Sequence, residues 1–110
     1  MKRLLLLCLL SVASLSAAQA KPQTFIGVIT DNMCARADHS QMQMGPTDAD
    51  CTRECINAHG AVYVLYNGTS AYTLSDQKTP AQFAAQKVRV TGTLDATTKT
   101  IKVDSIIATK

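Results

Sequence analysis

Residues 87–108, KVRVTGTLDATTKTIKVDSIIA, carry the pattern that decides the fold prediction. Apolar and polar side chains alternate along residues 87–94 and again along 99–108, which is the period of half-buried β-strands. Gly92 suits a sharply bent strand, because a side chain there would crowd the bend. The segment therefore predicts the last two strands of a small, strongly curved sheet.

Three further strands are predicted upstream, because three runs of the chain are also rich in β-branched and aromatic residues. They are residues 24–30, 61–66 and 70–74. Asn67-Gly68 separates the last two runs, and this dipeptide favours the positive φ angles of a tight type I′ turn. We therefore expect the second and third strands to pair as a hairpin.

A short helix is predicted over residues 79–86, between the third and fourth strands. Thr79 is a suitable N-cap, and Pro80 follows at the position where a missing N–H costs nothing. Five strands with a helix after the third follow the order of an OB-type barrel. The sequence thus predicts a mainly β fold, a small five-stranded OB-like barrel. An ordinary antiparallel sheet with a helix packed on it is the alternative.

The connection between the first two strands is a long insertion, residues 31–60, with the sequence DNMCARADHSQMQMGPTDADCTRECINAHG. Thr47 and Asp50 form a capping-box pattern, which predicts a helix over residues 48–59. Gly60 is a typical residue at the end of a helix. We expect this insertion to form a helical unit outside the sheet.

Five thiol and imidazole side chains are concentrated in this insertion. They are Cys34, His39, Cys51, Cys55 and His59. The last three recur every fourth residue and so share one face of the predicted helix. Thiolate and imidazole groups bind zinc, and soft sulfur donors also suit Cu(I). A metal site is therefore predicted with the three cysteines and His39 as ligands, and with His59 as a weaker candidate.

Two other interpretations of the cysteines stay open. In one, Cys34 forms a disulfide with Cys51 or Cys55 and one thiol is left over, which export to an oxidising compartment favours. In the other, Cys51 is a reactive thiol, because free N–H groups at the start of a helix favour a thiolate. An odd number of cysteines keeps the metal site in consideration, since a purely structural disulfide framework normally uses an even number.

Ordinary structural roles compete with the ligand roles of the other residues. A histidine such as His59, at the end of a helix, commonly interacts with the helix dipole. His39 lies in a polar loop, where a ligand and a solvated histidine are equally expected. Met33, Met42 and Met44 are potential soft ligands, but loop methionines more commonly cover an apolar patch.

The N-terminus has the three-part pattern of a secretory signal peptide. Lys2 and Arg3 precede a short apolar run, and small residues lead to a cleavage site after Ala20. The run is shorter than the roughly 20 residues that cross a bilayer, so no stable membrane anchor is expected. We predict that residues 1–20 are cleaved and that residues 21–110 form one periplasmic or secreted domain.

Cleavage leaves a nearly neutral domain. The chain has 11 lysines and arginines and 8 acidic residues; Lys2 and Arg3 leave with the signal, so the mature net charge is +1. No run of basic residues remains, which argues against nucleic-acid binding. Catalytic triad patterns and phosphate loops are also missing from the sequence, which favours a binding module over an enzyme. If the cysteines form a disulfide, the barrel face becomes the expected site for an oligosaccharide or peptide.

The chain also resembles a group of small exported bacterial proteins of unknown function with a predicted OB-like fold. The similarity extends over residues 27–107 and consists of a GxITDxMC segment, a histidine, a CxxxC pair and a VxVTGTL strand. It implies an OB-like fold and implies that the Cys/His set is the functional part of the domain. It implies no particular activity.

Overall fold

The computed structural model describes residues 21–109, so the expected signal peptide, residues 1–20, lies outside the described part of the chain. Within that part there are five strands, one α-helix and two 3₁₀ helices. In chain order they are β1 (Gln23–Asp31), η1 (Asn32–Cys34), α1 (Asp48–His59), β2 (Tyr63–Tyr66), β3 (Ala71–Leu74), η2 (Thr79–Phe83), β4 (Lys87–Asp95) and β5 (Thr100–Ala108). The fold is mainly β, as predicted.

The five strands form one closed sheet in the order β1-β2-β3-β5-β4, with β4 paired back to β1. All neighbouring pairs are antiparallel except β3 and β5, which are parallel. Closure leaves no long unpaired strand edge, which removes the main route to edge-to-edge aggregation. Because the sheet is closed and contains one parallel pair, the alternative of an ordinary antiparallel sheet is wrong.

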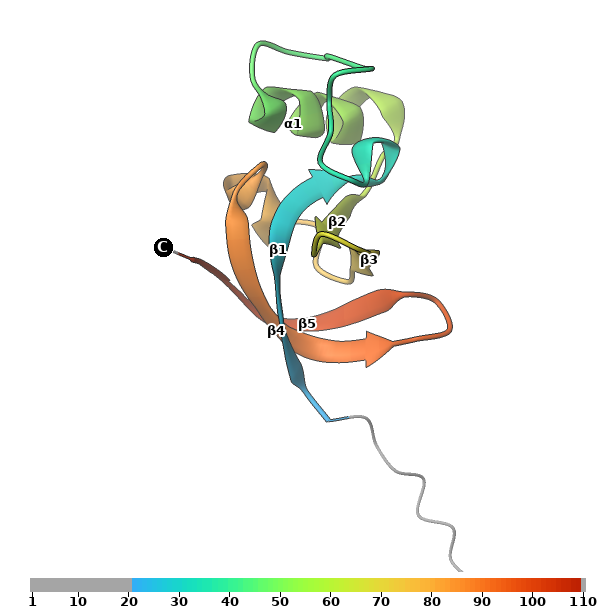
Figure 1. Ribbon diagram of the computed structural model, residues 1–110, viewed down its shortest axis with the longest axis vertical. Helices are drawn as coiled ribbons and strands as arrows, with labels where there is room; N and C mark the ends of the chain where they lie inside the picture. Colours follow the sequence, from blue (N-terminus) through green and yellow to red (C-terminus); the bar gives the residue numbers. More distant parts are fainter. Residues whose placement is uncertain (1–20, 110) are drawn as a thin grey trace, which may run out of the picture.

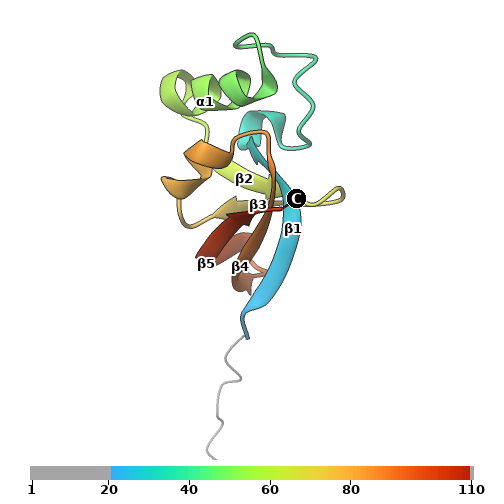
Figure 2. The ribbon, with the colours of Figure 1, turned by 90° about the vertical axis from the view of Figure 1, so that its left-hand side faces the viewer.

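The insertion between β1 and β2 covers one end of the closed sheet. In both views α1 and the loop before it lie beyond the end of β1, away from the β4–β5 hairpin (Figures 1 and 2). One hydrogen bond joins α1 to η2, from the Arg53 Nε–H to the Ala81 carbonyl at 3.1 Å. None of the helices in residues 21–109 has the length and apolar composition that a membrane span requires.

The interior of the closed sheet is filled by the apolar side chains that point inward from its five strands. The buried members of this core are Ile29, Tyr63, Leu65, Leu74, Val88, Val90 and Ile101. Every strand contributes at least one of them, so burial of this apolar surface stabilises the closed sheet as a unit. The alternation that predicted the strands is thus the feature that fills the core.

Gly92 lies where β4 bends. The register of the β4–β5 ladder shifts between Thr91 and Gly92, which marks a β-bulge. A Cβ at position 92 would press against the Lys102 carbonyl and lie 2.8 Å from Ile101 Cγ2. The predicted reason for this glycine, a bend too crowded for a side chain, is confirmed.

The turn predicted at Asn67-Gly68 is wrong in type. Tyr66 pairs with Ala71, so the loop has four residues, and Gly68 has a positive φ of 98° whereas Asn67 does not have a positive φ. The Asn67 side chain instead accepts hydrogen bonds from the N–H groups of Thr69 and Ser70, at 2.9 and 2.7 Å. This local side-chain bonding stabilises a wider loop than the type I′ turn.

The helix expected over residues 79–86 is a shorter 3₁₀ helix, and Thr79 is not its N-cap. The Asp76 carboxylate accepts hydrogen bonds from the N–H groups of Lys78 and Thr79, at 2.9 and 3.0 Å. These hydrogen bonds, of which those from Thr79 have the largest effect, hold the pKa of Asp76 below its usual range. Asp76 therefore fixes the start of η2, the role that the sequence assigned to Thr79.

We predict that Gly92→Ala destabilises the protein by about 1–3 kcal/mol, because the added methyl group overpacks the bulge against β5. Thr93→Ala, at the neighbouring half-buried position, is the matched control and should change the free energy of unfolding much less. Urea unfolding followed by circular dichroism measures both. Equal stabilities for Gly92→Ala and the wild type would show that the bulge has room.

Loss of the Asp76 carboxylate is expected to destabilise the fold in a pH-dependent way. Asp76→Ala should cost about 0.5–2 kcal/mol near neutral pH, the usual cost of losing a capping side chain. Because the folded pKa is lowered, the charged carboxylate stabilises the fold above its ordinary pKa, and this part is lost as pH falls through the folded pKa. Asp104→Ala, at an exposed position, is the control. A penalty that grows on acidification would contradict this account.

Candidate metal centre

The end of β1 positions the first thiol. Asp31 is fully buried, and its Oδ1 accepts hydrogen bonds from the N–H groups of Met33 and Cys34, at 3.0 and 2.9 Å. The Thr30 hydroxyl donates to the Cys34 carbonyl at 2.8 Å. These contacts make Asp31 the N-cap of η1 and fix Cys34 directly above the closed sheet.

A reversal of the chain after η1 brings His39 back to Cys34. The Ala37 N–H donates to the Cys34 carbonyl at 2.9 Å, and Ala37 itself has a φ of 57°. A non-glycine residue in the left-handed region is uncommon and mildly strained. The reversal leaves His39 only 4% exposed, so its imidazole is buried and is not the solvated side chain that was one of the two expectations.

Helix α1 supplies the remaining two thiols. Its bounds match the predicted helix, and the Thr47 side chain accepts a hydrogen bond from the Asp50 N–H at 3.1 Å. At the other end Gly60 has a left-handed φ of 70°, which confirms it as the residue that ends the helix. The helix face turned inward carries Cys51 and Cys55, which are 1% and 0% exposed.

Three of the predicted ligands meet in one place. The Sγ atoms of Cys34 and Cys51 and a ring nitrogen of His39 all lie within 4.8 Å of one another, and all three residues are buried. Cys55 is buried beside this group but does not belong to it at that distance. His59 is exposed at the end of α1 and lies outside the group, consistent with its weaker ranking.

Backbone groups of the loop before α1 surround the Cys51 sulfur. Its thiol donates to the Met42 carbonyl at 3.0 Å, and the Met44 N–H donates to the sulfur at 3.3 Å. The side chains of Met42 and Met44 also pack against the small buried cluster that contains Cys51 and Cys55. Covering an apolar patch is the role that the sequence favoured for these methionines.

Two unpaired polar atoms belong to His39 of this group and to Asp31, which caps η1 next to Cys34. Within residues 21–109, three buried side-chain atoms have no hydrogen-bond partner in the protein: Asp31 Oδ2, His39 Nδ1 and Thr52 Oγ1. Buried polar groups are nearly always hydrogen-bonded, so such atoms call for a specific explanation. A cation bound through Nδ1 would give that nitrogen a partner, and a cation at this cluster would offset the negative charge of Asp31.

Burial and the Asp31 carboxylate both act on the thiols. Desolvation first, and then the charge of Asp31, raise the pKa of Cys34 and raise the pKa of Cys55 to about 11. Sequence reasoning missed Asp31 as part of the site. A signal was available, because Asp31 is followed three residues later by the cysteine whose N–H it caps, which is the spacing of an N-cap.

The three described cysteines are free thiols, and no pair of them lies at disulfide distance. The alternative disulfide, from Cys34 to Cys51 or Cys55, is therefore not formed in this structure. Two of the thiols instead converge with an imidazole, which is part of the arrangement that the metal interpretation requires.

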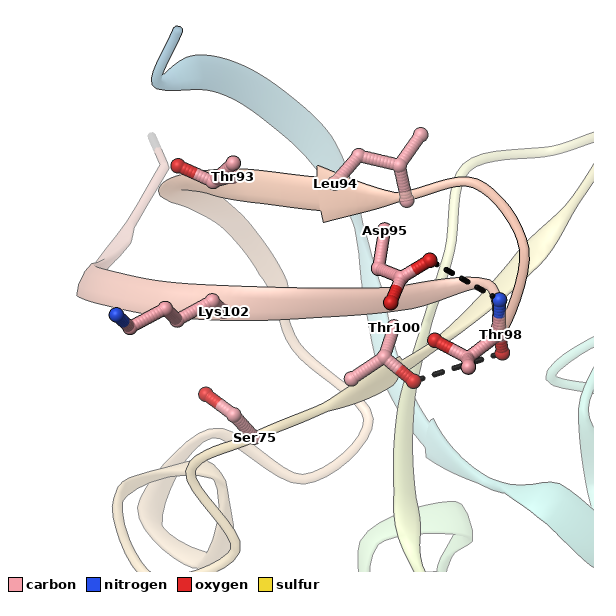
Figure 3. A pocket seen from close by; sticks show the side chains of 7 residues that line it. All are labelled: Ser75, Thr93, Leu94, Asp95, Thr98, Thr100 and Lys102. Atoms are coloured by element: carbon pink, nitrogen blue, oxygen red, sulfur yellow. Dashed lines mark hydrogen bonds between the residues drawn. The ribbon is translucent and has the colours of Figure 1, made fainter. Parts of the chain in front are cut away.

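A hollow of about 400 Å³ lies apart from the Cys/His group, beside the β4–β5 hairpin (Figure 3). Several of its polar groups already bond within the protein. Asp95 accepts hydrogen bonds from the N–H groups of Thr97 and Thr98, and the Ser75 hydroxyl oxygen accepts one from the Val103 N–H. The hollow thus lacks the unpaired buried atoms that distinguish the Cys/His group.

Fold and site together define a small closed-sheet protein with a buried Cys/His cluster in an insertion at one end. Comparison of the chain with models of protein families, with curated proteins and with solved structures found no match.

We predict that the thiols of the metal-free protein react with iodoacetamide in a defined order, Cys34 first and Cys55 last. Cys34 is 7% exposed at the edge of the cluster. Cys55 is fully buried, and a pKa of about 11 leaves only about one thousandth of it as thiolate at about pH 8. Timed alkylation followed by peptide mass spectrometry measures the order. The order should vanish in urea, and faster labelling of Cys55 than of Cys34 in the native protein would contradict it.

Proposed function

We propose that this protein is an exported, non-enzymatic binding module whose Cys/His cluster holds a thiophilic metal ion, Zn²⁺ or Cu(I). One observation carries the proposal. Two buried thiols and a ring nitrogen of a buried imidazole lie within 4.8 Å of one another, and His39 Nδ1 has no hydrogen-bond partner in the protein. These donor types are the ones that both ions prefer.

Cys34, Cys51 and His39 are the proposed primary ligands. Three such ligands suffice for Cu(I), whereas a structural zinc site takes four. Cys55 is the proposed fourth ligand for zinc, because it is buried beside the group and only a small rearrangement of α1 or the loop would bring its sulfur in. The Met44 N–H would stay bonded to the Cys51 sulfur as a neighbour that orients the ligand.

Two further parts of the proposal concern the fold and the location. The strand order and the single parallel β3–β5 pair support an OB-like barrel. The N-terminal signal pattern supports export and a mature chain that begins at Lys21. In an oxidising compartment a bound ion would also protect the thiols, because metal-bound thiolates are less available for disulfide exchange.

Metal binding should depend on His39 and not on His59. We expect native mass spectrometry of the protein, supplied with Zn²⁺ or with Cu(I) under anaerobic conditions, to show one bound ion. His39→Ala should weaken binding by more than the roughly 10–100-fold that loss of an outer-shell partner costs, because it removes a ligand. His59→Ala is the matched control and should bind like the wild type.

The same titrations test the coordination number. Cys55→Ser should weaken zinc binding strongly but leave Cu(I) binding nearly unchanged if Cu(I) takes only the three converging ligands. Denatured spectra recorded in parallel give the thiol state, since a disulfide lowers the mass by two hydrogens. A wild-type protein that binds neither ion while all three thiols are reduced would refute the proposed function.

A further inference from the structure

A solvent-open hollow leads from the surface to the metal centre. It has a volume of about 310 Å³ and lies over η1 and the loop that follows it. Cys34 is the one proposed ligand among its lining residues, and two thioether side chains, Met33 and Met42, line it as well. The hollow is therefore open to solvent and reaches the cluster at Cys34, with sulfur-containing side chains along its lining.

The sulfur donors of the hollow range from exposed to buried. Met33 is 43% exposed, whereas Cys34 is only 7% exposed. His39 and Cys51, the other two members of the cluster, are buried and do not line the hollow. Met42 connects the hollow and the cluster, because it lines the hollow and also packs against the buried cluster that contains Cys51.

The net charge of the residues that line the hollow gives it no preference for cations or anions in general. The charged residues that line it are one cation, Arg36, and one anion, Asp38, and their charges cancel to first order. A hard divalent cation therefore gains little there, because it needs oxygen ligands and negative charge. Thioethers bind soft ions such as Cu(I) and offer almost nothing to hard ones.

We propose that this hollow is the uptake path for Cu(I), with Met33 and Met42 as transient ligands that pass the ion to Cys34 and then to the buried centre. This inference rests on the proposed function and names Cu(I) as the cargo. Each step breaks one bond from copper to its previous ligand and forms one bond to a protein sulfur or, at the buried centre, to the His39 ring nitrogen. Copper stays Cu(I) throughout, and each thiol that becomes a ligand releases one proton to water.

The rate of copper uptake tests the path separately from the existence of the site. Cu(I) is supplied anaerobically as its bicinchoninate complex to the metal-free, reduced protein, and loss of the colour of the complex gives the rate. Met33→Leu keeps a side chain of similar size at an exposed position, so it should fold normally. We expect Met33→Leu and Met42→Leu to slow uptake several-fold and to leave the final copper content unchanged.

Two controls make the test specific. Gln41→Leu alters an exposed residue that lines the hollow but carries no sulfur, and it should take up Cu(I) at the wild-type rate. Uptake of Zn²⁺ from a coloured chelator should be equally fast in the wild type and in Met33→Leu.

Each other outcome counts against the path. Equal Cu(I) rates in the wild type and Met33→Leu would overturn it, as would equal slowing of Zn²⁺ and Cu(I), which would indicate steric obstruction. A wild-type protein that binds Zn²⁺ but not Cu(I) would overturn the path and leave the metal centre in place. Failure to bind either ion would overturn both.

Discussion

The buried carboxylate of Asp31 joins the two parts of this molecule. It belongs to the last residue of β1, and its Oδ1 bonds to the N–H groups that begin η1, so the closed sheet determines where Cys34 lies. Its other oxygen is buried, unpaired and close enough to raise the pKa values of Cys34 and Cys55. A buried carboxylate with one unpaired oxygen is only partly compensated by its two N–H hydrogen bonds, so the same residue that positions the thiol also favours a cation nearby.

The sequence predicted the closed sheet well, because the features that build it are local. Alternation over residues 87–94 marks the inward side chains of β4, and Gly92 marks the bend. On β5 the alternation holds only as far as Val103, and beyond it Ile106 packs against the core while Ile107 is exposed. The errors lie at turns, where a side chain competes with the backbone for the same N–H groups. Asn67 widens the β2–β3 loop in this way, and Asp76 takes the capping role that the sequence gave to Thr79. Such bonds depend on rotamers that a residue pattern does not specify.

The sequence predicted which residues belong to the candidate site, but it did not predict how they are arranged. Helical periodicity places Cys51 and Cys55 on one face of α1, and capping residues give the bounds of that helix. Periodicity does not predict the conformation of a loop. The burial of His39 depends on the backbone reversal at Ala37, and alanine is not a residue type that indicates a positive φ. The convergence of Cys34, His39 and Cys51 therefore required the fold itself.

The insertion also lacks an ordinary hydrophobic core of its own. The buried cluster under α1 consists of Cys51, Cys55 and Ala61, whereas the sheet encloses seven larger apolar side chains. Two thiols and a methyl group, with Met42, Met44 and Ile56 only partly buried against them, give little burial energy to a twelve-residue helix and its loop. An ion that binds only the folded arrangement adds its binding free energy to the stability of this region. The cysteines thus occupy positions where a larger domain would have leucines, and an ion bound to the cluster would couple its own binding to the stability of the insertion.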